Sequence, residues 1–189
     1  IAVVAAAVRR LGNGRALGGG LILAAAGLLV VAVGESHGGI VVICIGLLVI
    51  GAGVGLAFTV STGAVLGSVP ADRAGAASAI SETGLELGVA LGVAVLGTIQ
   101  DVGYRLLLGR PPAGLPDRVV DAAEQSLATL SGVIDQADPG QARLLGHAQT
   151  AFTHAMQATA VIAAGILLVA GVMAARRVPA TSETSEETA

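Results

Sequence analysis

The chain has 189 residues, of which 54% are hydrophobic, 12% are charged and 2% are aromatic. A water-soluble domain normally carries about 25% charged residues, so this composition argues against a soluble globule and favours a membrane protein. The formal net charge of −3 gives no basic field for nucleic acid, and a single cysteine excludes a disulfide framework and a cysteine metal cluster.

Four long apolar segments follow one another along the chain. We predict membrane-spanning helices over residues 16–33, 40–60, 74–99 and 152–175. The first would be about 27 Å long as a helix, close to the ~30 Å thickness of a hydrocarbon core. A signal peptide supplies one such segment and does not account for four. The sequence therefore predicts an all-α, multi-pass membrane protein.

The connecting segments complete the predicted organisation. Residues 1–15 are interpreted as the end of a preceding span and a cytoplasmic loop, which implies that the chain is a fragment. Residues 61–73 are expected to form a cytoplasmic loop, and residues 176–189 a disordered cytoplasmic tail. The orientation rests on six arginines that would all lie on the cytoplasmic side. They are Arg9, Arg10, Arg15, Arg73, Arg176 and Arg177.

The long connection over residues 100–151 is predicted to be external and to contain amphipathic helices. Its apolar residues recur at helical spacing at Val119, Val120, Ala123, Leu127, Leu130 and Ile134. The sequence Asp138-Pro139-Gly140 is typical of a turn, after which a helix can continue into the fourth span. We expect an external helical hairpin here, and a solvated loop is the alternative.

Several sequence motifs do not support a nucleotide-binding, metal-binding or catalytic site. Gly51, Gly53 and Gly55 lack the strand and the acidic partner of a nucleotide-binding loop. We interpret them as serving helix packing, with Gly51 and Gly55 as a small-residue pair, or as a flexible bend. The remaining candidates are three histidines without metal-ligand spacing and four serines without a histidine base: His37, His147, His154, Ser61, Ser68, Ser78 and Ser81. The sequence therefore predicts no catalytic residue, no metal site and no cofactor.

The third predicted span carries two ionisable residues, Glu82 and Glu86, spaced i, i+4 on one helix face. Ionisable groups inside a membrane are costly and point to function. Counted from residue 74, Glu86 lies roughly 18 Å along the helix axis, near the bilayer midplane. The two carboxylates are therefore candidates to hold a proton and to exchange it for a cation. The alternative is that Glu82 lies near the interface and hydrogen-bonds to serine or threonine neighbours.

Three glycines mark a second face of the same predicted helix. Gly84, Gly88 and Gly92 form a ridge about 140° around the helix from the glutamates. Such a smooth face lets a neighbouring backbone approach closely. We expect the ridge to pack against another helix while the carboxylates face a cavity.

The residues around this span carry a resemblance to a known family. In chain order they are Val69-Pro70, Asp72, Gly75, Ala77-Ser78, Glu82, Leu87-Gly88, Gly92, Ala94 and Gly97. This pattern resembles the penultimate region of the 14-spanning drug:proton antiporters of the major facilitator superfamily, and the QacA-type antiseptic exporters are the nearest group. The stretch from Phe152 to the Arg176-Arg177 pair is similar to the last span of that family.

The resemblance implies a partial C-terminal helical bundle of that superfamily, with spans 11 to 14 present and the N-terminal spans missing. It also implies proton-coupled efflux of hydrophobic or cationic drugs across a bacterial cell membrane, with Glu82 and Glu86 matching acidic residues linked to recognition of cationic drugs. The implied partners are these substrates, protons, the lipid bilayer and the missing spans of the same chain. Two alternatives stay open: an exporter of the same fold with another cargo, such as a self-made antibiotic or a metabolite, and a non-transporting four-span remnant or interaction protein. A membrane-embedded enzyme has no supporting constellation.

Overall fold

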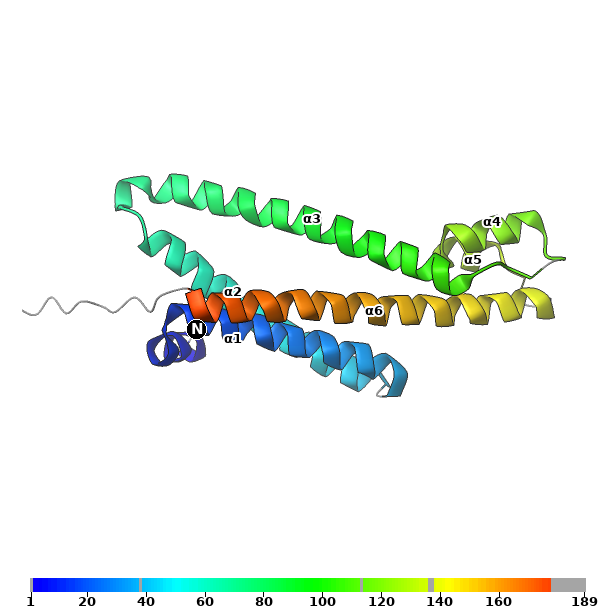
Figure 1. Ribbon diagram of the computed structural model, residues 1–189, viewed down its shortest axis with the longest axis horizontal. Coiled ribbons are helices and arrows are strands. Elements are labelled where there is room, and N and C mark those ends of the chain that lie inside the picture. Colours follow the sequence, from blue (N-terminus) through cyan, green and yellow to red (C-terminus); the bar gives the residue numbers. More distant parts are fainter. Residues whose placement is uncertain (1, 38, 113, 136–137, 178–189) are drawn as a thin grey trace, which may run out of the picture. The chain divides into compact units, whose positions relative to one another are not determined.

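The computed structural model describes residues 2–37, 39–112, 114–135 and 138–177, and these residues contain helices and no β-strand. The elements are α1 (Ala2–His37), α2 (Gly39–Gly67), the 3-10 helix η1 (Ala71–Arg73), α3 (Ala74–Leu108), α4 (Asp117–Gln125), α5 (Leu127–Val133) and α6 (Pro139–Arg177) (Figure 1). Four of the helices are long and apolar enough to cross a membrane. The predicted all-α membrane class is confirmed.

The helices extend beyond the apolar segments from which they were predicted. Helix α2 continues to Gly67, through most of the expected loop over residues 61–73. Helix α1 runs through the expected loop before the first span and is interrupted only at Gly12, whose φ of 77° and ψ of 162° produce a kink. A backbone helix needs no apolar side chains to continue, so apolar length underestimates helix length. The predicted disordered tail from residue 178 onward lies outside the described residues.

The chain divides into two compact units. The first comprises the described residues of Ile1–Gly88 and Ala163–Ala189, and the second comprises those of Val89–Ile162. Helices α3 and α6 each contribute residues to both units. Each unit has its own way of packing its helices.

In the first unit, α1 and α2 lie side by side and contact each other through small residues (Figure 1). A Cβ atom at Gly20 would lie 2.8 Å from the carbonyl oxygen of Gly53 and 2.9 Å from the amide nitrogen of Ala57. A Cβ atom at Gly53 would lie 2.5 Å from the amide nitrogen of Ala24. The two backbones therefore approach more closely than any larger residue allows, as is common between membrane helices.

Gly51 and Gly55 pack against no described residue of this chain, so their interpretation as a packing pair stays a prediction. An added Cβ at either position meets nothing within 4 Å, whereas Gly53 between them is buried against α1. The buried residues of α2 are Gly46, Gly53, Ala57 and Val60, which form a stripe on one side of the helix. Gly51 and Gly55 lie off this stripe, because two residues correspond to about 200° of helix rotation.

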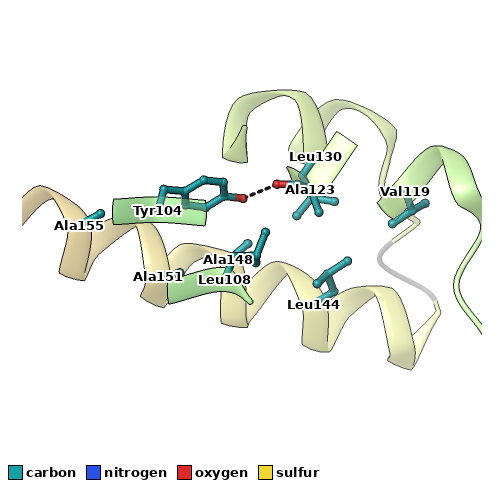
Figure 2. Close-up of a cluster of buried hydrophobic side chains, with 9 residues drawn as sticks. All are labelled: Tyr104, Leu108, Val119, Ala123, Leu130, Leu144, Ala148, Ala151 and Ala155. Atoms are coloured by element: carbon teal, nitrogen blue, oxygen red, sulfur yellow. Dashed lines mark hydrogen bonds between the residues drawn. The ribbon is translucent and has the colours of Figure 1, made fainter. Parts of the chain in front are cut away.

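The second unit is held by a cluster of buried apolar side chains from α3, α4, α5 and α6. Its members are Tyr104, Leu108, Val119, Ala123, Leu130, Leu144, Ala148, Ala151 and Ala155 (Figure 2). The Tyr104 hydroxyl donates a hydrogen bond of 2.9 Å to the carbonyl oxygen of Ala123 (Figure 2). A buried hydroxyl needs such a partner, so this bond fixes α4 against the end of α3. The amphipathic helices predicted for this connection are present as α4 and α5, and their position outside the cell stays a prediction.

Local hydrogen bonds set the ends of these helices. The chain extends at Ser126 (φ −171°), whose side chain accepts a hydrogen bond of 3.1 Å from the amide of Thr129 and so caps α5. At the start of α6, Asp138 accepts hydrogen bonds from the amides of Gly140 (2.7 Å) and Gln141 (3.3 Å). These bonds hold the pKa of Asp138 below its usual value. The predicted turn at Asp138-Pro139-Gly140 is thus a helix cap, and α6 continues from it without interruption to Arg177.

Candidate functional site

A hollow of about 280 Å³ lies between the last turns of α2 and the first turns of α3, within the first unit. Both helices supply its walls because η1 reverses the chain between them. The residues that line the hollow are Phe58, Ser61, Thr62, Val65, Leu66, Ser78, Ser81, Glu82 and Leu85. The hollow therefore combines one carboxylate with four hydroxyl groups and an apolar wall.

The four hydroxyl groups of the hollow are not committed to the helices that carry them. Among the described residues, Ser61, Thr62, Ser78 and Ser81 form no hydrogen bond through their side chains, and neither does Glu82. Hydroxyl groups are both donors and acceptors, and an ionised carboxylate is an acceptor only. These side chains are all exposed, so their oxygen atoms face solvent on both walls of the hollow.

Neighbouring hydroxyl groups outside the hollow behave differently. Thr59 donates a hydrogen bond of 2.8 Å to the carbonyl oxygen of Gly55, and Thr83 donates one of 2.9 Å to that of Ala79. Ser68, just beyond the end of α2, donates one of 2.8 Å to the carbonyl oxygen of Val65. Such bonds to the preceding turn are the ordinary way in which a helical serine or threonine satisfies its hydroxyl. The free hydroxyls are therefore a property of the hollow and not of the surrounding helices.

The structure places one of the two predicted glutamates in the hollow. Glu82 lines the hollow, whereas Glu86, one turn further along α3, is not among the lining residues. Both side chains are exposed in this chain. The alternative that Glu82 hydrogen-bonds to serine or threonine neighbours finds no such bond within the part of the chain that the structure describes.

The glycine ridge of α3 is uncovered. An added Cβ at Gly84, Gly88 or Gly92 meets nothing within 4 Å. No described residue of this chain therefore packs closely against the ridge, and its role in helix packing stays a prediction.

The hydroxyl groups of the hollow are the residues that sequence reasoning missed. Ser61, Ser78 and Ser81 were weighed as nucleophiles and Thr62 was not singled out, and Ser61 and Thr62 fall in a segment expected to be a loop. One signal was present, because Ser78 precedes Glu82 by four residues and so shares its helix face. The contribution of α2 depends on where the chain turns, which the apolar pattern does not specify.

The structure gives no support to a metal centre in its described part, where no three histidine, cysteine, aspartate or glutamate side chains are placed to hold a metal ion. His147 and His154 are both exposed on α6. The side chain of His37 lies outside the described residues.

Comparison with known proteins finds curated proteins to which this chain is similar. It is 37% identical over 152 residues to the multidrug efflux pump LfrA of Mycolicibacterium smegmatis, and the matched region covers 80% of this chain and 30% of the relative. It is 28% identical over 146 residues to the methyl viologen resistance protein SmvA of Salmonella typhimurium, and the matched region covers 77% of this chain and 29% of the relative. No family model and no solved structure matches. The chain thus spans less than a third of the length of the curated relatives it matches, and it is an all-α membrane protein similar to one part of them.

Proposed function

We propose that this chain is the C-terminal part of a multidrug efflux transporter that exports hydrophobic cations in exchange for protons. The similarity to an efflux pump and to a methyl viologen resistance protein supports export, and methyl viologen is an aromatic dication. The observation that carries the cationic cargo is the pair of carboxylates on α3, one turn apart in a candidate membrane span. Acidic side chains in such a span are costly and are kept where they serve transport.

The carboxylates couple the two fluxes because cation and proton compete for the same oxygen atoms. An ionised carboxylate attracts a cation in a low-dielectric environment, and protonation removes the charge that holds the cation. If the site opens alternately to the two sides of the membrane, binding of a proton on one side releases the drug there. Opposed binding at one site is what exchange requires.

The orientation inferred from the arginines places the turn between α2 and α3 on the cytoplasmic side. Arg73 lies in η1 at this turn, and Arg176 and Arg177 lie in the last turn of α6. The hollow beside Glu82 then faces the compartment from which an exporter takes its cargo. In this proposal the protein lies in the bacterial cytoplasmic membrane, uses no cofactor and works together with the N-terminal spans of the full-length chain.

The test is Glu86→Gln in the full-length transporter, with Glu82→Gln beside it. The variant removes the Coulomb attraction between this carboxylate and the dication, and a loss of about 1.4–2.8 kcal/mol should reduce methyl viologen export by about 10- to 100-fold. Export of uncharged compounds should change much less, because they need only the apolar walls. We expect Glu82→Gln to act in the same direction but more mildly, since it lies nearer to interfacial water. Uptake of each compound and proton release are measured in everted membrane vesicles.

Glu124→Gln is the matched control, because Glu124 lies on α4, outside the four candidate spans. It should leave the transport of every compound unchanged. The site assignment is wrong if both α3 variants reach the membrane and export cations with unchanged pH dependence. Export of only uncharged compounds by the unaltered protein would instead favour an exporter of the same fold with another cargo.

A further inference from the structure

We infer that Phe58 is a specificity-determining residue of the hollow, where the face of its ring binds the quaternary cations that Glu82 attracts. The inference rests on the proposed function, because it names the residue through which the transporter holds cations that cannot donate a hydrogen bond. It is carried by the placement of a carboxylate and an aromatic ring on the two walls of one hollow.

The surroundings of Phe58 differ from those of the other two aromatic residues. The sequence contains two phenylalanines, one tyrosine and no tryptophan. Tyr104 and Phe152 pack against each other in the second unit, with ring centroids 6.3 Å apart and an angle of 70° between the ring planes. Phe58, in contrast, is 53% exposed and lines the hollow. Its ring is therefore open to a ligand, whereas the other two rings contact each other.

The packing of α2 does not explain an aromatic residue at this position. The buried stripe of α2 includes Ala57, and Phe58, the next residue, points about 100° away from it. Lipid tails are as apolar as leucine, so contact with lipid is satisfied equally well by an aliphatic side chain. What a phenylalanine adds is a ring face of negative electrostatic potential. That property is of use toward a positively charged ligand.

A quaternary nitrogen needs this kind of partner. It carries no N–H donor, so neither the carboxylate of Glu82 nor a hydroxyl of the hollow can form a hydrogen bond with it. Two attractions remain: the Coulomb attraction of a carboxylate, and a cation–π interaction with an aromatic ring whose centroid lies within about 6 Å. Methyl viologen, the dication of the proposed function, bears both of its charges on quaternary nitrogens. Glu82 and Phe58 supply the two attractions from α3 and α2, respectively.

The size and the remaining walls of the hollow fit one charged end of such a ligand. Its volume of about 280 Å³ is slightly below the range of about 300–1,000 Å³ that is typical of pockets for whole drug-sized ligands. Val65 and Leu85 provide apolar contact for the carbon atoms next to the charge. Removal of water from the cation by these groups strengthens a cation–π interaction.

The experiment replaces Phe58 in the purified full-length transporter by phenylalanines that carry one, two or three fluorine atoms on the ring. Fluorine withdraws electrons from the ring face and weakens its attraction for a cation, while the shape of the side chain changes little. The probe is methyl viologen, and its dissociation constant is measured by calorimetry. We expect binding to weaken stepwise with the number of fluorine atoms, by about three- to tenfold for three, as for loss of a cation–π contact. Phe58→Leu, which stays apolar, should weaken binding by a similar factor.

The matched control is the same fluorinated series at Phe152, whose ring packs against Tyr104 and does not line the hollow. It should leave the dissociation constant of methyl viologen unchanged. A dissociation constant that does not vary with fluorination of Phe58, or that varies equally with fluorination of Phe152, overturns the inference while the proposed function stands. Failure of the unaltered transporter to bind methyl viologen also overturns it, and the proposed function fails with it only if Glu82→Gln and Glu86→Gln leave cation export unchanged.

Discussion

Two glycines of α2 and two of α3 have opposite surroundings. Gly46 and Gly53 on α2 are buried against α1, and each has backbone atoms of that helix where a Cβ would lie. Gly84 and Gly88 on α3 have nothing within 4 Å of that position. Glycine spacing therefore predicts that a helix has a smooth face, and only the arrangement of the neighbouring helices decides whether the face is used.

The packed glycines matter because of what they contact. Lipid tails are as apolar as leucine, so membrane helices gain little from hiding apolar surface from each other and depend on close backbone approach. The atoms around Gly53 include the amide nitrogen of Ala24 and the carbonyl oxygen of Gly20. Backbone atoms of a helix cannot rotate aside as a side chain does. An added side chain there must therefore separate α1 from α2.

The largest effect is expected for Gly53→Leu. Overpacking normally costs about 1–3 kcal/mol, and a clash with backbone atoms of α1 should reach the upper end of this range or exceed it. The measurement is the fraction of folded protein during denaturant titration in detergent micelles. Gly51→Leu is the control two residues away, because a Cβ at Gly51 meets nothing within 4 Å. Equal destabilisation by the two variants would show that the contact between α1 and α2 does not depend on Gly53.

An intermediate effect is expected for Gly88→Leu in the full-length transporter. If the ridge packs against another helix of that protein, a leucine should push the two helices apart and lower the amount of folded protein in the membrane. The loss should be smaller than for Gly53→Leu, because no described residue of this chain lies against Gly88. Val89→Leu is the control, since the next residue points about 100° away from the ridge. Normal accumulation and transport of Gly88→Leu would show that the ridge is not an interface.

The apolar pattern was sufficient to predict the four long helices, because membrane spans are specified by length and composition. It did not locate their ends, since α2 continues through Ser61 and Thr62. It also did not show the break at Ser126, where an N-cap divides one amphipathic stripe into α4 and α5. These features depend on local hydrogen bonds and turns rather than on hydropathy.

The candidate site was also predicted only in part, because hydropathy does not reveal the turn that brings its two walls together. Glu82 was identifiable because a charge interrupts an apolar segment. The hydroxyls that line the hollow with it come from two helices, between which the chain reverses at η1. Spacing within one helix can reveal Ser78, four residues before Glu82, but it cannot reveal partners on α2.

The smallest effect is expected for Gly103→Ala, a glycine of α3 that lies in the second unit. An added Cβ would lie 3.3 Å from the Cβ and 3.7 Å from the Cα of Ala155 on α6, so it meets mainly a methyl group. A shift of a few tenths of an ångström relieves this contact, and alanine is favoured over glycine in a helix by about 0.8–1 kcal/mol. We therefore expect the free energy of unfolding to change by less than about 1 kcal/mol, measured as for Gly53→Leu. Gly53→Ala adds the same methyl group against backbone atoms and should destabilise clearly more. Equal, small changes in the free energy of unfolding for the two alanine variants would show that the atoms near an added Cβ do not determine its effect on stability.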